Sequence, residues 1–260
     1  MSEAGQRSAV SGRLNGGAYA GASHTSQDLA LWQPQRASAD SNILDARDTL
    51  VARARDLERN NGWISGAVQR HVDEGIGARF TLQARPDWKA LGQSADWARE
   101  WSREVESRFR AWAYDPRNLC DATERMNFSA LLGLLFRQRF VEGASFAVIE
   151  WLPGRGGYST AITAVDTDRL SNPRGAPDTD TLRGGVELSQ AGAAVAYHIQ
   201  NRHPYDHLLN NAADQWTWRR FPKRETWGRP RVIHHFDVKR AGQHREVADI
   251  VAVLERIKMI

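Results

Sequence analysis

RVIHHFDVKRAGQHREV, residues 231–247, contains three histidines, one aspartate and four arginines or lysines. This composition fits a metal site, a catalytic site, a nucleic-acid-binding patch, or a strand that runs into a loop. In a strand, His234 and His235 point to opposite faces, so their rings cannot bind one ion from adjacent positions. The spacing to Asp237 and His244 matches no compact metal motif. The stretch therefore predicts a strand followed by a loop, and no metal centre.

The segments on both sides of this stretch indicate the fold class. Upstream, SFAVIEWL and YSTAITAV flank PGRGG, and GVELS and AVAYHIQ flank QAGA, which are two hairpin signals. QWTWRRF, residues 215–221, reads as a further strand. Downstream, apolar residues return at helical spacing: Val247, Ile250, Val251, Leu254 and Ile257.

The N-terminal half is predicted to be mainly helical. Apolar residues from Ile43 onward recur at steps of three or four, which predicts two helices, the second capped by Asn60 or Asn61. Residues 78–84, ARFTLQA, read as a strand. Two more helices are expected at about 94–114 and 123–141. The expected fold is α+β, with N-terminal helices packed on antiparallel hairpins.

The helix expected at 94–114 has an aromatic face. Its members fall at steps of four and three: Trp97, Trp101, Val105, Phe109 and Trp112. An apolar stripe at this spacing is typical of a buried helix face. We therefore expect Trp101, in the middle of the stripe, to lie in the core.

The positive charge of the chain is concentrated in one window. The 260 residues carry a net charge of +4, and residues 216–245 alone carry +7, which leaves −3 for the remainder. The cations that would contact DNA or a partner are Arg219, Arg220, Lys223, Arg224, Arg229 and Arg231. Tryptophans and a phenylalanine lie between them and could stack on bases. An edge hairpin with inward aromatics and solvated charges explains the pattern equally well.

Several classes of protein are disfavoured by the sequence. The only cysteine, Cys120, excludes a disulfide framework and a thiolate zinc site. Residues 1–20 lack the apolar core of a signal peptide, and the apolar stretch at 129–136 is too short to cross a bilayer. We therefore expect no membrane association.

No catalytic motif is recognisable. GIGARF, residues 75–80, has Phe80 where a dinucleotide-binding loop needs its third glycine, and PGRGG lacks the Lys-Ser/Thr of a phosphate-binding loop. There is no GxSxG, and the Asp166/Asp168 pair lies in a turn-rich stretch. The sequence thus predicts no catalytic residue, no cofactor and no metal ligand.

Four blocks, in order, resemble one family. ARDLERNNGWISGAVQRHVDEGIGARFTLQARPD (54–87) resembles the N-terminal signature of lambda-type phage portal proteins: a helix, an Arg-Asn-Asn-Gly-aromatic corner, a second helix and a Gly-terminated turn. WAREWSREVESRFRAWA (97–113) resembles the family's aromatic-acidic helix, and LRGGVELSQAGAAVAYHIQNRHP (182–204) its Gly-Val hairpin. RVIHHFDVKRAGQHREVADIVAVLERIKM (231–259) resembles its Ile-His-X-Phe strand, Arg-X-Gly-Gln-X-Arg loop and following helix.

The resemblance assigns family positions within residues 231–247. His234 is similar to the family's strand histidine, and the family-motif loop corresponds to Arg240, Gly242, Gln243 and Arg245. None of these is a catalytic position in the family. The chain departs from the pattern at Glu246, where the family usually has glycine, and at Ala241, where it usually has proline.

The resemblance also implies a domain organisation and partners. Residues 43–260 would be a portal wing-like domain that stops before the stem, clip and crown; the preceding residues 1–42 are expected to be a flexible, disordered arm on composition alone, because they are rich in Ser, Ala, Gly and Gln and have few core formers. Such subunits form a ring, typically of twelve copies, at one capsid vertex of the virion after assembly in the host cytoplasm. The implied partners are further copies of the chain, the terminase large subunit, the major capsid protein, head-tail connector proteins and double-stranded DNA bound without sequence preference.

Two alternatives to a working portal subunit stay open at this point. One is a non-catalytic prophage remnant, which would fold without forming a working channel. The other is a nucleic-acid-processing enzyme that uses the basic window. Whether the chain is a working portal subunit or a prophage remnant, a wing-like fragment is expected to be mostly monomeric or to form weak, heterogeneous oligomers.

Overall fold

A computed structural model of the chain describes residues 20–22, 27–206 and 216–259. The chain divides into two units, Met1–Ala37 and Ser38–Ile260. The described part of the first unit contains the 3₁₀ helix η1 (Ala20–Ala22) and an exposed turn with Leu31 and Trp32. Most of the arm expected over residues 1–42 lies outside the described residues.

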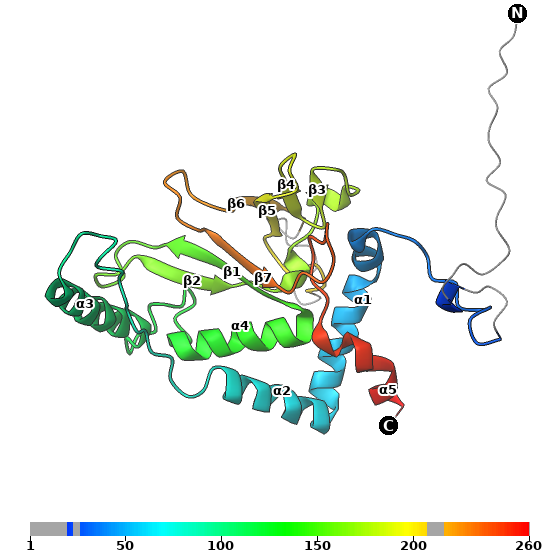
Figure 1. Cartoon of the computed structure of the whole chain (residues 1–260), viewed down its shortest axis with the longest axis horizontal. Coiled ribbons are helices and arrows are strands. Elements are labelled where there is room, and N and C mark those ends of the chain that lie inside the picture. The colour runs from blue at the N-terminus through cyan, green and yellow to red at the C-terminus, as the bar shows by residue number, and fades with distance from the viewer. Residues whose placement is uncertain (1–19, 23–26, 207–215, 260) are drawn as a thin grey trace, which may run out of the picture. The chain divides into compact units, whose positions relative to one another are not determined.

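The second unit is α+β, as the sequence predicts (Figure 1). Its α-helices are α1 (Ala39–Asn60), α2 (Gly62–Gly75), α3 (Ala95–Ala113), α4 (Phe128–Glu142) and α5 (Leu254–Lys258). Its strands are β1 (Ala144–Trp151), β2 (Thr160–Ala164), β3 (Leu182–Arg183), β4 (Val186–Leu188), β5 (Ala194–Gln200), β6 (Trp218–Pro222) and β7 (Val232–Phe236). The 3₁₀ helices among the described residues of this unit are η2 (Thr167–Arg169), η3 (Pro173–Gly175) and η5 (Asp249–Val253).

The strands form two antiparallel sheets. The first has the order β2-β1-β7 and the second β3-β4-β5-β6. Both predicted hairpins are confirmed, because β1 pairs with β2 and β4 pairs with β5. The predicted strands β6 and β7 are also present, but they belong to different sheets. Strand β7, which carries His234 and His235, therefore lies beside β1, far from it in sequence.

Strand β1 lies between two layers. Phe146 and Val148 point into a core shared with the second sheet, together with Tyr197 and Phe221. Ala147, on the opposite face, packs against Leu131 and other residues of α4. This alternation is the two-residue period of a strand whose two faces are both covered. Helices α1 and α2 then pack on α4 as an outer layer (Figure 1).

Local capping explains where the helices begin. The Asn61 side chain accepts hydrogen bonds from the backbone N–H groups of Trp63 and Ile64, which satisfies two of the free donors at the start of α2. Ser94 caps α3 and Asn127 caps α4 in the same way. The cap at Asn127 shows that α4 begins at Phe128, five residues after the predicted start at 123.

The side chain of Asp121 organises the loop before α4. The buried carboxylate of Asp121 accepts hydrogen bonds from the backbone N–H groups of Thr123, Arg125 and Met126. In a helix from residue 123 these N–H groups would lie in the first turns of the helix. Their hydrogen bonds to the Asp121 side chain instead stabilise a non-helical loop. The sequence prediction of a helix from residue 123 is therefore wrong by about one turn.

The predicted strand at 78–84 is absent. The segment is extended but belongs to neither sheet. Side chains bind its backbone instead: Phe80 N–H donates to Ser129 Oγ at 2.8 Å, Tyr114 O–H donates to the Phe80 carbonyl at 2.6 Å, and Ala84 N–H donates to Glu106 at 2.9 Å. These bonds satisfy backbone groups that a ladder partner would otherwise have to satisfy.

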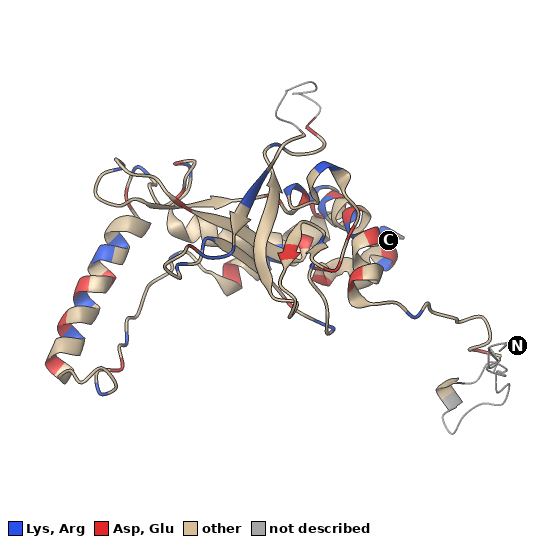
Figure 2. Ribbon diagram, turned by 90° about the horizontal axis from the view of Figure 1, so that it is seen from above, with Lys and Arg blue, Asp and Glu red and all other residues tan. Residues whose placement is uncertain are grey.

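The aromatic face of α3 is only partly buried. Phe109 and Trp112 pack on Phe128 at the end of the helix nearest the sheets. The first half of α3 stands away from the sheets, and Trp101 keeps 39% of its surface exposed (Figures 1 and 2). The expectation that Trp101 lies in the core is therefore wrong, because the stripe extends beyond the body that could cover it.

This difference makes a prediction about stability. Trp101→Ala should lower the free energy of unfolding by no more than about 1 kcal/mol, as surface substitutions do. Trp112→Ala, at the covered end of the same stripe, should cost about 2 kcal/mol, less than a fully buried aromatic. Urea denaturation of both variants checks the contrast. Equal losses would show that something covers Trp101.

The C-terminal elements of the second unit pack against the later half of α1. Helix α1 begins at Ala39, inside the arm expected over 1–42, and the C-terminal apolar residues form η5 and the short α5 rather than one regular helix. Leu57 of α1 and Leu254 of α5 share one apolar cluster with Val68 and Val141. No helix of the described residues is long and apolar enough to span a membrane.

Candidate functional site

Residues 231–247 build a buried charge cluster around Glu246. This carboxylate is completely buried and accepts hydrogen bonds from Arg47 Nε at 2.7 Å, from Arg245 at 3.1 Å and from His234 Nε2 at 3.0 Å. Arg47 comes from α1, His234 from β7, and Arg245 from the loop between β7 and η5. The cluster therefore joins the helical layer to the first sheet.

Arg245 extends the cluster to the second sheet. Its guanidinium donates to the backbone carbonyls of Leu170 at 2.7 Å and Thr167 at 3.2 Å, and to that of Gly184. Gly184 has φ +51°, and a Cβ there would lie 2.8 Å from Leu44 and 3.0 Å from Arg245. Glycine is therefore needed at this position for the close approach of the arginine.

The rest of the family-motif loop shapes the turn that delivers Arg245. Gln243 is buried; its Oε1 accepts the backbone N–H groups of Lys239 and Arg240, and its Nε2 donates to the Arg245 carbonyl at 2.9 Å. Gly242 takes φ +74°, which other residues adopt only with strain. The side chain of Arg240 is exposed. These contacts are all internal to the fold.

His244 fastens the loop to the start of α1. Its backbone N–H and its Nδ1 contact the two oxygens of the buried Asp40 at 2.9 and 2.7 Å. Asp40 also lies 3.6 Å from Arg183 of β3. His234, His235 and His244 therefore occupy three separate surroundings: the Glu246 cluster, an exposed strand face, and Asp40.

Burial and neighbouring charges together set the pKa values of the groups in this cluster. Burial favours the neutral carboxyl of Glu246, but Arg245, Arg47 and His234 outweigh it and hold its pKa well below the usual range. For Arg47, burial is again outweighed, and Glu246, Asp168 and Asp48 raise its pKa. Burial, reinforced by the positive charge of Arg47, lowers the pKa of Arg245.

His234 is neutral in this cluster. Burial lowers its pKa below 6.5, and the hydrogen bond to Glu246 only partly opposes this effect. The positive charges of Arg245 and Arg47 lower the pKa of His234 further. The imidazole then donates its Nε2–H to Glu246 as a neutral group.

A pH dependence of stability follows. Below pH 6.5 the unfolded chain protonates its histidine while the folded chain does not, so this contribution to stability is present above pH 6.5 and is lost as the pH falls. The loss should reach up to about 1.4 kcal/mol per pH unit. In His234→Gln this component should vanish, so the stability gap between wild type and variant should narrow from pH 7.5 to 5.5.

Urea unfolding at both pH values measures the gap. His235→Gln, on the exposed face of the same strand, is the matched control and should keep the wild-type profile. Parallel pH profiles for wild type and His234→Gln would show that folding does not lower the pKa of His234.

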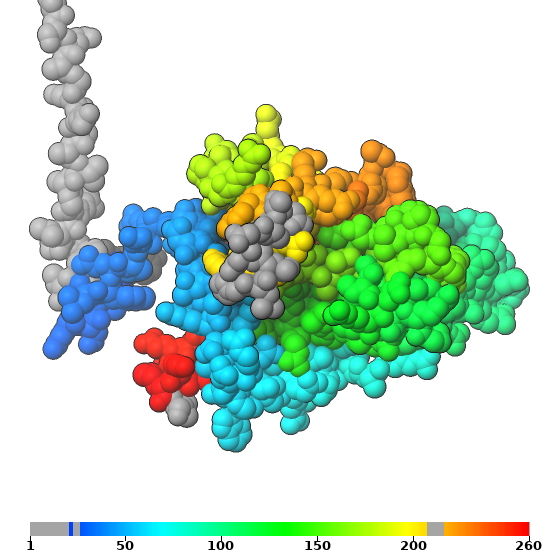
Figure 3. Space-filling view, turned by 180° about the vertical axis from the view of Figure 1, so that it is seen from behind, coloured from blue at the N-terminus to red at the C-terminus, as the bar shows by residue number. Residues whose placement is uncertain are grey.

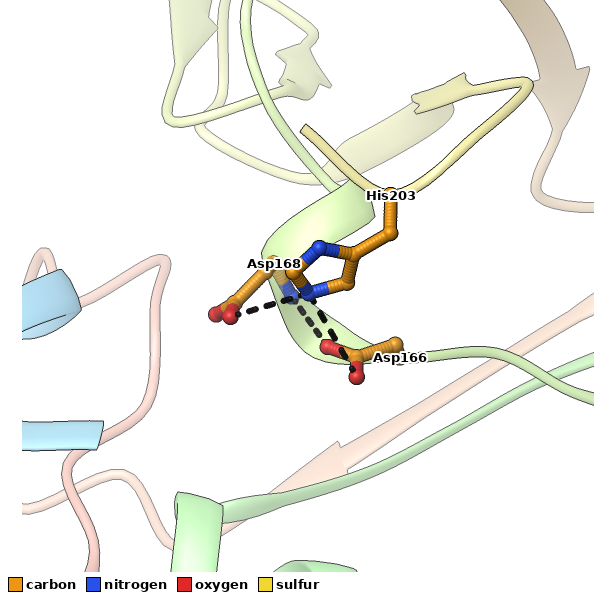
Figure 4. A group of neighbouring side chains, drawn as sticks. All are labelled: Asp166, Asp168 and His203. Atoms are coloured by element: carbon orange, nitrogen blue, oxygen red, sulfur yellow. Dashed lines mark hydrogen bonds and ion pairs between the residues drawn. The ribbon is translucent and has the colours of Figure 1, made fainter. Parts of the chain in front are cut away.

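A second charge cluster centres on Arg55. Its guanidinium contacts Glu142 at 2.8 Å, Asp166 at 2.7 Å and Asp168 at 2.6 Å. Burial opposes the charge of Arg55, but these three carboxylates outweigh it and raise the pKa of the guanidinium. His203 Nε2 lies 3.5 Å from Asp168 and 3.8 Å from Asp166 (Figure 4).

Asp166, Asp168 and His203 could in principle ligate a metal, since their ligand atoms lie within 4.8 Å of one another. Arg55, however, already supplies the positive charge at the two aspartates, and Asp166 also caps η2 by accepting the Asp168 N–H. A cation would have to displace the guanidinium. The group is therefore an ion-pair cluster that joins α1 to the loop after β2.

The cations of the basic window do not form one patch of free charge. Arg220 makes a bidentate pair with Glu187 at 2.7 and 2.9 Å, and Arg231 pairs with Glu225 at 2.9 Å. Arg229 donates to Thr160 and lies over the rings of Trp151 and Trp227. The remaining three, Arg219, Lys223 and Arg224, have no carboxylate partner among the described residues.

Neither cluster contains the parts of a catalytic centre. Burial raises the pKa of the only thiol, Cys120, to about 11, so it is protonated at neutral pH. Every carboxylate of the two clusters is held by a guanidinium, a histidine, a hydroxyl or a backbone N–H. Within the described residues the motif positions thus act as cross-links between elements.

Sequence reasoning missed the α1 members of these clusters. Asp40 and Arg47 lie on the same helical stripe as Val51 and Ala54, at steps of three and four. A charged residue at a position of the buried stripe must find a buried partner. That spacing was the available signal, but it does not identify Glu246 as the partner.

Known proteins resemble the chain over most of its length. The model of a family described as "Phage portal protein, lambda family" matches residues 25–260. Portal protein B of Escherichia phage lambda is 31% identical over 245 residues, which are 94% of this chain and 45% of that protein. The portal protein of Escherichia phage N15 is 32% identical over 233 residues, 89% of this chain and 43% of that protein.

A more distant relative is the probable portal protein of Halomonas phage phiHAP-1, 26% identical over 182 residues, which are 68% of this chain and 34% of that protein. The chain spans less than half the length of these curated relatives. The match to the family model nevertheless covers both clusters and all the strands. The chain belongs to the lambda family of phage portal proteins.

Proposed function

We propose that this chain is the wing part of a portal ring at the capsid vertex, where the ring is the conduit for DNA packaging and ejection and the point of head-tail joining. The observation that carries the proposal is the family match over residues 25–260. The buried Arg245 cluster supports it, because the family-motif loop cross-links the elements of the fold and leaves no group for chemistry.

Membership of this family makes the chain a structural virion protein rather than an enzyme. The alternative of a nucleic-acid-processing enzyme accordingly falls. The alternative of a non-catalytic prophage remnant is compatible with the same fold, because it differs from the proposal only in whether the chain becomes part of a working channel.

The proposed partners are those of a portal vertex. Further copies of the chain would form the ring, twelve in the typical case, and the terminase large subunit, the major capsid protein and connector proteins would bind its surfaces. The proposed location is the virion, after assembly in the host cytoplasm. The division into an arm at 1–42 and a wing-like domain at 43–260, which would precede a stem, clip and crown, belongs to the same proposal.

Replacement in a known portal tests the proposal. The segment of lambda portal protein B that matches this chain is exchanged for it, and particles are examined by electron microscopy. We expect closed rings and DNA-filled heads. A folded hybrid protein that makes no rings would contradict the proposal, and the same hybrid with Arg245→Met is the control for a destabilised fold.

We also propose that the basic surface on β6 and the loop after it contacts the DNA backbone. On β6 and the loop after it, Arg219, Lys223 and Arg224 have no carboxylate partner among the described residues, whereas Arg220 and Arg231 are paired and Arg229 is held by Thr160 and two tryptophan rings. With three phosphate contacts, the logarithm of the affinity for DNA should fall by roughly 0.9 per contact for each tenfold increase in salt concentration, regardless of the DNA sequence.

Fluorescence anisotropy with two unrelated DNA duplexes measures this binding. Arg219→Glu/Lys223→Glu/Arg224→Glu should weaken both complexes equally, and Arg99→Glu/Arg103→Glu on α3 is the matched charge control. Binding that prefers one duplex, or that survives the triple change, would contradict the DNA contact and leave the ring proposal intact.

A further inference from the structure

The segment that precedes α3 is extended like a strand but has no ladder partner. Residues 79–87 form neither helix, turn nor bend, and they belong to neither sheet. The side chains of Thr81, Gln83 and Arg85 are exposed, and those of Leu82 and Ala84 are half-buried, which is the two-residue period of a strand with one covered face. The segment and α3 project together from one end of the second unit (Figures 1 and 2), and Figure 3 shows this end from behind, in teal at the right border.

One edge of this segment is fastened to the fold. In an extended chain the N–H and C=O groups of one residue point to the same edge, and those of the next residue point to the opposite edge. Phe80 donates its N–H to Ser129, and its carbonyl accepts the hydroxyl of Tyr114. Ala84 donates its N–H to Glu106 of α3. The edge to which Phe80 and Ala84 point is therefore held by side chains of α4 and α3.

The opposite edge of the segment is open. It is formed by the residues that alternate with Phe80 and Ala84: Arg79, Thr81, Gln83 and Arg85. Among the described residues, none of these four has a hydrogen bond to its backbone N–H or C=O group. A row of free donors and acceptors at strand spacing is a template for a further strand. The backbone of this edge therefore fits an extended peptide segment, which would bind by strand addition.

The charges of the segment favour an acidic occupant. Residues 78–86 contain two arginines and no acidic residue. Arg79 lies over the ring of Tyr114 and Arg85 donates to Gln83, and neither arginine has a carboxylate partner among the described residues. Opposite charges that face each other across two strands stabilise the pairing. A strand with carboxylates opposite Arg79 and Arg85 would therefore be preferred.

The acidic groups beside the segment do not cancel this charge. Asp87, which follows the open edge, accepts the backbone N–H of Ala90. Glu106, in the groove between the segment and α3, accepts the N–H of Ala84 on the fastened edge, and the same groove is lined by Arg99 and Arg103. The two arginines of the open edge therefore keep their charge for an incoming strand.

The same segment of a second copy would not suit this edge. An antiparallel pair in full register would place Arg79 opposite Arg85, and a parallel pair would place each arginine opposite itself. Like charges directly opposite each other destabilise a strand pair. The edge strand β6 of a second copy carries Arg219 and Arg220 and ends at Pro222, which has no N–H to donate. The occupant is therefore a different protein.

We propose that the open edge at residues 79–85 binds an acidic extended segment of another protein by strand addition, with carboxylates opposite Arg79 and Arg85. The backbone groups of the edge supply the hydrogen bonds, and the two arginines select the side chains. The inference goes beyond the proposed ring, because it concerns a different protein and needs no second copy of the chain.

A designed peptide tests the backbone pairing on the unmodified chain. The probe is fluorescein-labelled Glu-Val-Thr-Val-Thr-Val-Glu, whose carboxylates have the spacing of Arg79 and Arg85. In an antiparallel pair the N–H groups of its glutamates and threonines face the chain, and those of its valines face away. N-methylation of both threonines removes two hydrogen bonds and should weaken binding, measured by fluorescence anisotropy, at least about fivefold. N-methylation of two valines is the matched control and should change the affinity less than about twofold.

Charge reversal tests the two arginines. Arg79→Glu/Arg85→Glu should weaken binding of the acidic peptide at least about tenfold, and it should bind the peptide in which lysines replace both glutamates. Both arginines are exposed, so folding should be retained. Arg53→Glu/Lys258→Glu changes exposed positions on α1 and α5, near the other end of the unit, and is the control that should bind the acidic peptide like the wild type (Figure 1).

Three outcomes would overturn the inference. Equal binding of the two N-methylated peptides would show that charge alone holds the peptide. Displacement of the peptide by a DNA duplex, together with that equality, would assign the two arginines to phosphate groups instead. A wild type that does not bind the unmethylated peptide at any soluble concentration would remove the strand addition. The proposed ring would stand in each case.

Discussion

Replacing Arg245 with methionine is expected to lower the free energy of unfolding by about 3–5 kcal/mol, the usual cost of removing one partner of a buried ion pair. Methionine fills a similar length but offers no donor. The carbonyls of Thr167, Leu170 and Gly184 would then be buried without their hydrogen bonds, and Glu246 would lose one of its two guanidiniums. Urea denaturation at neutral pH measures the loss.

Two further variants separate the causes. Arg240→Met, at an exposed position of the same loop, should change stability by no more than about 0.5 kcal/mol. Arg245→Met/Glu246→Gln should recover part of the loss, because a neutral amide is easier to bury than an unbalanced carboxylate. An Arg245→Met variant as stable as the wild type would refute the structural role of the loop.

Replacing Arg55 with alanine is expected to lower the free energy of unfolding by about 3 kcal/mol. Three carboxylates, Glu142, Asp166 and Asp168, would lose their common cation and repel one another. His203 is already beside the two aspartates (Figure 4). The variant should therefore gain an affinity for divalent cations that the wild type lacks, because in the wild type the guanidinium already occupies the site.

Thermal unfolding with and without Mn²⁺ tests this prediction. The melting temperature of Arg55→Ala should rise on addition of Mn²⁺, while those of the wild type and of Arg59→Ala, an exposed control on the same helix, should not change. A wild type stabilised by Mn²⁺ to the same extent would show that the aspartates and His203 form a metal site despite Arg55.

The strands and hairpins were predictable because their signals are local. The alternation around PGRGG and QAGA places two hairpins where the structure has them. The opposite orientation of His234 and His235 also followed from the two-residue period, and the structure buries the first side chain and exposes the second. The start of α2 was predictable for the same reason, because the cap at Asn61 involves only the backbone N–H groups of Trp63 and Ile64.

The charge clusters were not predictable, because their partners lie far apart in sequence. Glu246 meets Arg47 across 199 positions, and His244 meets Asp40 across 204. The extended segment at 78–84 resembles a strand in composition, and only the positions of Ser129, Tyr114 and Glu106 show that side chains replace a ladder partner. The exposure of Trp101 depends on how far α3 extends beyond the sheets.

Native mass spectrometry of the unmodified protein at increasing concentration tests head-to-tail assembly most directly. A subunit that joins its neighbours head to tail should give a series of oligomers that differ by one chain and continue past the dimer, up to a single closed ring at most. A protein that stops at the dimer at every concentration would contradict head-to-tail assembly, since a self-complementary pair leaves no surface for a third copy.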